Sequence, residues 1–222
     1  MTRQLLIGLA FTFFLVLPSL AMAQTGGVQD GVKLGKTFVS GENPGIRLLD
    51  KENGTVLAAA SFWRIIWSPV GPGHICYLTT GDGKSPNDLR VALVDNQKLH
   101  EYLVSEILGT FNTSYAERPF TVVPATFTKS GDLVREWKEI CRSNDAKYAI
   151  ELVWRDFYEP FQLDTPTGGQ RNPFGITSFF IPAKSAEIIV NGKPLAGNVY
   201  PVMRGPVQNS TAFLAFSETW VK

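Results

Sequence analysis

Apolar and polar residues alternate along much of the chain, which is the pattern of β-strands with one buried face. In Leu89–Leu93 every second residue is a large apolar one, and the longer stretch Tyr148–Tyr158 follows the same period. Asn-Gly pairs at 53–54 and 191–192 stand between such stretches and favour tight hairpin turns. The pattern therefore predicts a chain made mainly of strands joined by short turns.

Two stretches in the middle of the chain have helical spacing instead. The first begins at a cap supplied by Asp95 or Asn96 and ends at Gly109, and its apolar positions are Leu99, Tyr102, Leu103, Ile107 and Leu108. The second is capped by Ser130, and its apolar positions are Leu133, Val134, Trp137, Ile140 and Cys141. We therefore predict an α+β fold that is predominantly antiparallel β, with a curved sheet or partly open β-barrel and two helices in the middle of the chain. The absence of regular βαβ alternation argues against a doubly wound nucleotide-binding fold.

The first 23 residues have the pattern of a secretory signal peptide. Arg3 lies in a short polar start, an apolar run follows over 5–20, and Ala21-Met22-Ala23 gives the small residues that signal peptidase accepts. We expect cleavage before Gln24, an extended segment over 24–45 and a single β-rich domain over 46–222. The mature protein is then periplasmic or secreted.

Composition narrows the choice of partners. Without Arg3 the chain carries 20 basic and 20 acidic residues, so its formal net charge is zero. It has no basic cluster for nucleic acid and no polybasic patch for an anionic membrane. No second apolar run is long enough for a membrane span, so none is expected after cleavage. The oligomeric state is left open by the sequence.

The chain has two cysteines, Cys76 and Cys141. In an oxidising compartment a disulfide between them is expected, and the alternative is a pair of buried free thiols. His74 and His100 are the only histidines, and no spacing of histidines or cysteines suits a metal. We therefore expect no metal and no other cofactor.

Strand alternation supplies the candidate chemistry. In Tyr148–Tyr158 the face that holds Trp154 would also hold Asp156, which places a carboxylate in the interior at one end of the sheet. Such a group needs a partner or has a raised pKa. The alternative is that the strand ends earlier and Asp156 lies in a loop. Asp156 is therefore a candidate catalytic acid.

Two further charged residues, Arg64 and Glu218, lie at positions where the strand pattern is apolar, and a histidine lies at the start of a strand. Arg64 lies between Phe62 and Ile66, and Glu218 between Phe216 and Trp220. Arg64 could bind a ligand carboxylate or form a structural ion pair with Asp156 or Glu218. His74 opens a strand after a Gly-Pro-Gly turn, a place where catalytic groups often occur, and the alternative is that it only starts the strand. Glu218 and His74 are the other candidate catalytic residues.

Aromatic side chains gather around Trp154 and Tyr158, and the glycine-rich segment 165–175, which contains Arg171, could form a lid over them. These residues are the candidate ligand contacts, with Arg64. The function that the sequence favours is binding of a small, partly aromatic molecule in a β-sheet pocket. A cofactor-independent lyase, isomerase or hydrolase that uses carboxylate or histidine acid/base chemistry is the second hypothesis. An envelope interaction module is the third.

Overall fold

The computed structural model describes residues 37–81, 85, 88–111, 113–168 and 173–221. The predicted signal peptide and Arg171 lie outside these residues. The strands are β1 (Thr37–Glu42), β2 (Gly45–Leu49), β3 (Val56–Trp67), β4 (Gly73–Thr80), β5 (Arg90–Val94), β6 (Thr121–Gly131), β7 (Glu136–Ser143), β8 (Ala149–Phe157), β9 (Phe161–Thr165), β10 (Gly175–Val190), β11 (Lys193–Pro194), β12 (Pro201–Arg204), β13 (Val207–Ser210) and β14 (Ala212–Val221). The helical elements are α2 (Gln97–Leu103), a π-helical turn (Val104–Leu108), α3 (Gly109–Phe111) and α4 (Ser114–Glu117).

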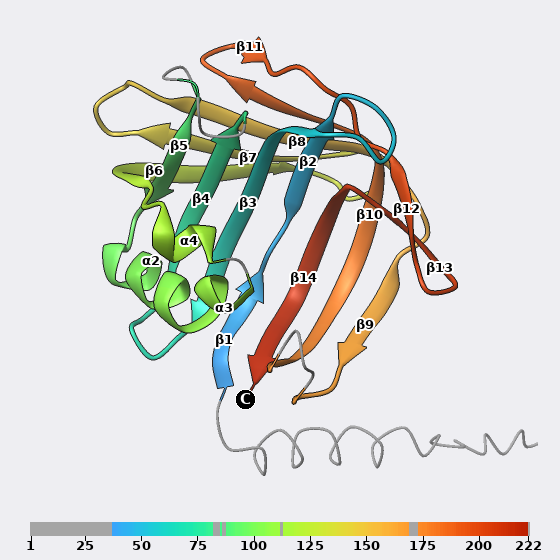
Figure 1. Cartoon of the computed structure of the whole chain (residues 1–222), viewed down its shortest axis with the longest axis horizontal. Helices are drawn as coiled ribbons and strands as arrows, with labels where there is room; N and C mark the ends of the chain where they lie inside the picture. The colour runs from blue at the N-terminus through green and yellow to red at the C-terminus, as the bar shows by residue number, and fades with distance from the viewer. Residues whose placement is uncertain (1–36, 82–84, 86–87, 112, 169–172, 222) are drawn as a thin grey trace, which may run out of the picture.

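The strands form two layers that share two long strands (Figure 1). The front layer contains β14, β2, β3, β4 and β5 in that order, and β6, β7 and β8 form most of the back layer and run across it. In β10, residues 175–182 pair with β14 and residues 183–190 pair with β8, so this strand passes from one layer to the other. β6 does the same, because it pairs with β5 at its start and with β7 afterwards.

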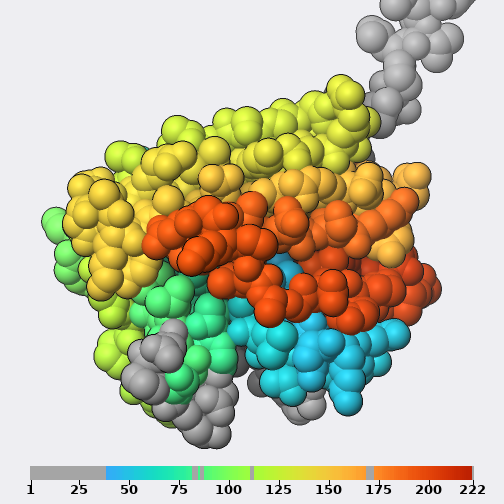
Figure 2. Space-filling view, turned by 90° about the horizontal axis from the view of Figure 1, so that it is seen from above, coloured from blue at the N-terminus to red at the C-terminus, as the bar shows by residue number. Residues whose placement is uncertain are grey.

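These pairings close into a ring of hydrogen-bonded strands, and the prediction of a predominantly β fold is confirmed. The ring is not a regular barrel, and the sheet is mixed because β5 and β6 run parallel to each other. At one end, the connection between β11 and β12 covers the space between the layers (Figure 2). It is held there by hydrogen bonds in both directions between Leu49 and Asn198, with N···O distances of 2.8 and 2.9 Å.

The two faces of the front layer pack against different parts of the chain. Its inner face packs against the back layer, where Phe62 of β3 meets Trp154 and Leu152 of β8 in one hydrophobic cluster. Its outer face is partly covered by the helical segment, where Trp63 of β3 belongs to a second cluster with Leu99 of α2. Adjacent residues of one strand thus serve two cores, as the period of two requires. No helix in the described part of the chain is long and apolar enough to cross a membrane.

The first predicted helix is confirmed and the second is wrong. Asn96 caps α2, because its Oδ1 accepts a hydrogen bond from the backbone N of Leu99 at 3.2 Å. The second stretch is instead the hairpin of β6 and β7. Trp137, Glu139 and Cys141 alternate toward the interior there, and the buried charge of Glu139 hides the period of two from a hydropathy pattern.

Two local predictions have clear outcomes. The Asn-Gly turn at 191–192 joins β10 to β11, and both residues have positive φ (51° and 76°), as a tight hairpin turn needs. The predicted extended segment over 24–45 includes β1, which is instead part of the sheet. β1 and β2 lie one after the other between β14 and β3, separated by Asn43 and Pro44.

Candidate functional site

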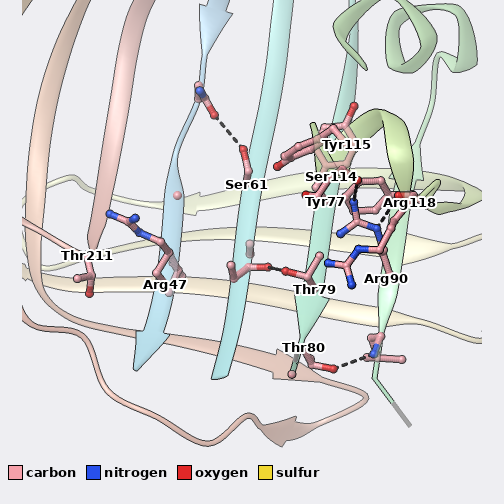
Figure 3. Close-up of a pocket in the computed structure, with 18 of the residues that line it drawn as sticks. Arg47, Ser61, Tyr77, Thr79, Thr80, Arg90, Ser114, Tyr115, Arg118 and Thr211 are labelled. Carbon is pink, nitrogen blue, oxygen red and sulfur yellow. Dashed lines mark hydrogen bonds between the residues drawn. The ribbon is translucent and has the colours of Figure 1, made fainter. Parts of the chain in front are cut away.

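The best-formed pocket lies on the outer face of the front layer and has a volume of about 480 Å³. Its floor consists of strands β2, β3 and β4, and the α4 corner and β14 supply opposite sides (Figure 3). The side chains discussed below that line it are Asn43, Arg47, Ser61, Tyr77, Thr79, Arg90, Ser114, Tyr115, Arg118, Phe120 and Phe213.

One wall of the pocket is aromatic. The ring of Tyr77 has its centroid 5.6 Å from that of Tyr115 and 5.0 Å from that of Phe120, with edge-to-face geometry in both pairs. The Tyr77 hydroxyl is 3.0 Å from Nδ1 of His100, so it is already engaged behind the wall. Burial raises the pKa of Tyr77 well above its usual value and raises that of Tyr115 as well, so both phenols are neutral at physiological pH.

Arg90 links the sheet to α4 and to Arg118, the residue that follows α4. Its Nε donates to the carbonyl oxygen of Arg118 at 2.7 Å and a terminal nitrogen donates to that of Ser114 at 2.6 Å. Its guanidinium carbon lies 4.0 Å from the centroid of Phe120. Burial lowers the pKa of Arg90, but an arginine stays charged at any physiological pH. Arg90 therefore fixes the wall and adds a permanent positive charge to it.

Two more arginines complete the charge of the pocket. Arg47 of β2 lies on one side, and Arg90 and Arg118 lie on the other (Figure 3). Arg47 is exposed, and its guanidinium makes no hydrogen bond or ion pair within the described part of the chain. None of the described residues that line the pocket is an aspartate or glutamate. The lining of the pocket thus combines three arginines with an aromatic wall.

A row of polar side chains leads from this pocket into the protein. The Ser61 hydroxyl donates to Oδ1 of Asn43 at 3.3 Å, and both residues line the pocket. Nδ2 of Asn43 donates in turn to Oε1 of Glu218 at 3.1 Å. The same oxygen accepts a hydrogen bond from Nε1 of Trp220 at 2.6 Å. Glu218 is therefore separated from the pocket by a single side chain.

Glu218 is 4% exposed, and burial raises its pKa to about 7, against the opposing effect of the hydrogen bonds from Trp220 and Asn43. The sequence pattern placed Glu218 on one face with Phe216 and Trp220. In the structure Ser217 has a φ of 51° and interrupts the alternation, so Phe216 packs in the cluster between the layers and Trp220 in the outer one. Glu218 and Trp220 therefore lie on the same face of β14, which is the face on the side of the pocket.

Arg64 faces the interior between the layers. One terminal nitrogen donates to Oε2 of Glu139 at 2.6 Å, and the other contacts Glu42. Glu139 is fully buried and also accepts from Nε1 of Trp137 at 3.0 Å. Arg64 does face inward as the strand pattern suggested, but its partners are Glu42 and Glu139 and neither Asp156 nor Glu218. This geometry is that of a structural ion pair.

His74 is the register partner of Arg64 on β4 and lies beside it on the same face. Nδ1 of His74 is 2.6 Å from one carboxylate oxygen of Asp95, and the other oxygen accepts from the His74 backbone N at 2.6 Å. Gly73 allows this approach, since a Cβ there would lie 2.9 Å from Asp95 and 2.7 Å from Asn96. The ring also stacks on Phe127 with centroids 5.2 Å apart. Asp95 leaves Nε2 as the histidine nitrogen that can exchange a proton with another group.

The remaining candidates from the sequence lie elsewhere. Asp156 is exposed with a φ of 53°, so the strand period ends there and its carboxylate does not enter the interior. Trp154 is buried, and its Nε1 donates to the carbonyl oxygen of Gly45 at 3.1 Å beneath the pocket. Tyr158 has Lys184 over its ring, with Nζ 5.3 Å from the centroid. Among the described catalytic and ligand-contact candidates, only Arg64 and His74 are brought side by side, and none lines the pocket.

The structure does not contain the predicted disulfide. Cys76 of β4 and Cys141 of β7 are both buried free thiols whose sulfur atoms lie beyond bonding distance. Burial raises the pKa of the Cys141 thiol well above its usual value, and a hydrogen bond with Cys76 raises it further. The two thiols fill the interior between the layers as small apolar groups.

We expect thiol titration without reductant to find two free thiols in denaturant and none in the native protein over the same time. The physical reason is that burial excludes the reagent from both thiols and also suppresses the thiolate of Cys141. Mass spectrometry after alkylation checks the count. A chain with no titratable thiol in denaturant would contradict this structure and support the disulfide predicted from the sequence.

Comparisons of the chain with protein-family models, with curated proteins and with solved structures find no match of significance.

Proposed function

We propose that this protein binds a small anionic molecule with an aromatic or apolar part in the pocket between α4 and β14. The observation that carries the proposal is the lining itself, in which Arg47, Arg90 and Arg118 have no carboxylate among the described lining residues. Arginine binds carboxylate, sulfonate and phosphate groups through charge-assisted hydrogen bonds. The wall formed by Tyr77, Tyr115 and Phe120 suits a flat apolar group next to the anion.

The volume agrees with such a ligand. A space of about 480 Å³ is within the usual range for small-molecule sites, which are mostly apolar with a few placed polar groups. The expectation of a pocket for a partly aromatic molecule is thus retained as a proposal. Its place in the fold and its polar contacts differ from those predicted around Trp154 and Tyr158.

Naphthalene-2-sulfonate is a direct probe, because it carries an aromatic ring system and one permanent negative charge. Titration calorimetry at neutral pH is expected to show binding that is clearly stronger than that of 2-naphthalenemethanol, which has the same rings and no charge. Equal affinity for the two compounds, or no binding of either, would reject the proposal of an anion pocket.

Arg47→Gln is expected to weaken binding of naphthalene-2-sulfonate about tenfold, because one charge-assisted contact is lost while the fold is kept. Arg47 is exposed and supports no other described side chain, so the thermal unfolding midpoint should not change. Arg142→Gln is the matched control, since Arg142 is exposed on β7 in the back layer and the change in net charge is the same. Equal weakening in both variants would show that only the net charge of the protein matters.

We also propose that the protein works outside the cytoplasm, as the pattern of residues 1–23 indicates. A binding protein in the periplasm or in the medium would meet its ligand there. Mass spectrometry of the exported protein should give an N-terminus at Gln24. A retained Met1–Ala23 segment would contradict this.

His74 and Asp95 keep acid/base catalysis as a second candidate function. The 2.6 Å hydrogen bond between Nδ1 of His74 and Asp95 orients the imidazole as in a general base, and a second from the His74 backbone N holds the carboxylate in place. The depression beside them is shallow, and Arg64 and Asn96 also line it. It encloses a substrate less than the arginine-lined pocket does. Hydrolysis of 4-nitrophenyl esters that is lost in His74→Gln would favour this function, and turnover that survives the substitution would reject it.

A further inference from the structure

The polar row behind the pocket ends at a carboxyl group that the proposed binding function does not use. Glu218 of β14 is 4% exposed, and Asn43 and Trp220 both donate to its Oε1, at 3.1 and 2.6 Å. The Ser178 hydroxyl of β10 is 1% exposed and adjoins the same carboxyl without a hydrogen bond of ordinary geometry to any described group. A protonated carboxyl could donate to this hydroxyl from its other oxygen.

Few charges compensate Glu218. Among the described residues, Arg204 of β12 is the cation that favours its ionisation, and Arg204 is exposed and lies over the ring of Phe180. The other groups at the carboxyl are the neutral side chains of Asn43, Trp220 and Ser178. An ionised Glu218 would therefore be a buried negative charge with hydrogen-bond donors but without a close cation among the described residues, which costs free energy.

The pocket wall itself offers no group that titrates near neutral pH. Its arginines stay charged, and burial moves the pKa of Tyr77 and that of Tyr115 upward, away from neutrality. His100 lies behind Tyr77, and burial lowers the pKa of its imidazole, so it loses its proton in more acidic solution. Above that range, Glu218, which lies behind Asn43, is the buried group of the described polar row whose charge changes.

We propose that Glu218 makes the pocket a proton-linked anion site, in which the anion binds to the form with a protonated Glu218 and binding draws a proton onto this carboxyl. The inference rests on the proposed function, because it needs an anion in the pocket. The link is the contact chain from Ser61 through Asn43 to Glu218, which brings the carboxyl within one side chain of the ligand. Like charges separated by one side chain repel each other strongly in a protein interior.

The sign of the effect follows from the charge. As the pH rises through about 7, Glu218 ionises and its negative charge opposes that of the ligand. Affinity for naphthalene-2-sulfonate should therefore fall about tenfold between pH 6 and pH 8.5, the order expected for a like charge one side chain away from the ligand. The charge of the sulfonate is constant over this range, so the ligand contributes no proton of its own.

Two measurements test the proposal on the full mature chain. In the wild type, calorimetry in buffers of different ionisation enthalpy should show proton uptake on binding near pH 7. In Glu218→Gln, which keeps an acceptor for Asn43 and Trp220 and can donate to Ser178, the affinity should stay at its value for pH 6 across the whole range, without proton uptake. Glu151→Gln, on β8 in the back layer, is the matched control and should keep the dependence on pH.

The outcomes separate this inference from the proposed function. No binding of the sulfonate at any pH would reject the anion pocket itself. Binding without proton uptake in the wild type would leave the pocket intact and overturn the role of Glu218, even if Glu218→Gln did not fold. A dependence on pH that persists in Glu218→Gln and disappears in His100→Gln would assign the effect to His100 and also overturn the proposal.

Discussion

Arg64→Met is expected to lower the free energy of unfolding by about 3–5 kcal/mol near neutral pH, because it leaves the fully buried carboxyl of Glu139 without its cation. Burial already raises the pKa of Glu139 against the effect of Arg64. The loss should therefore become smaller in acid, where Glu139 can be neutralised by a proton. Urea denaturation of both proteins at several pH values measures it.

The double variant Arg64→Met, Glu139→Gln separates the ion pair from the packing around it. It removes both charges and keeps an acceptor for Nε1 of Trp137, so it should be more stable than the single variant. Arg135→Met is the surface control, because the Arg135–Asp132 pair is exposed and should make only a small contribution to stability. A loss of that size in Arg64→Met would mean that water reaches the pair.

The elements that the sequence predicted well are those with a long, regular period. The face of Ile150, Leu152 and Trp154 on β8 is buried as expected, as is Tyr148 just before the strand, because these residues pack between two layers. The helix capped by Asn96 is also present, since a cap and an apolar stripe are local signals. Local periodicity thus gave the strand faces and one of the two helices.

The errors have a common physical cause, which is that tertiary partners and backbone irregularities override local patterns. Glu139 is polar, but it faces inward because Arg64 on another strand neutralises it, so β7 does not look like a strand. Positive φ angles at Asp156 and Ser217 shift the faces of β8 and β14 at the very positions where the chemistry was sought. A hydropathy pattern contains no signal for either effect.

The pocket could not be predicted for a related reason. Arg47 comes from β2, Arg90 from β5 and Arg118 from the end of α4, and they surround one space only because of the order and register of the strands. Taken singly in the sequence, each resembles a solvent-exposed residue. The absence of lining carboxylates, among the described residues, is likewise a property of the assembled face.

Glu218→Gln is expected to change how stability depends on pH. The pKa of Glu218 is raised from 4.5 in the unfolded chain to about 7 in the folded one. Below pH 4.5 both states hold the proton and the group has no effect. Between pH 4.5 and 7 the unfolded state ionises first, so the wild type loses stability as the pH rises, by about 3 kcal/mol in total. The glutamine variant should lack this loss.

The difference in unfolding free energy between Glu218→Gln and the wild type isolates this effect, because the other titrating groups are common to both proteins. Urea denaturation at pH 4.5, 5.5, 6.5 and 8 should show the variant gaining relative to the wild type up to about pH 7 and then a constant difference. Parallel curves would mean that Glu218 ionises alike in both states. A relative loss at high pH would mean that Trp220, Asn43 and Arg204 stabilise the carboxylate by more than burial costs, and the proton-linked pocket would then lack its physical basis.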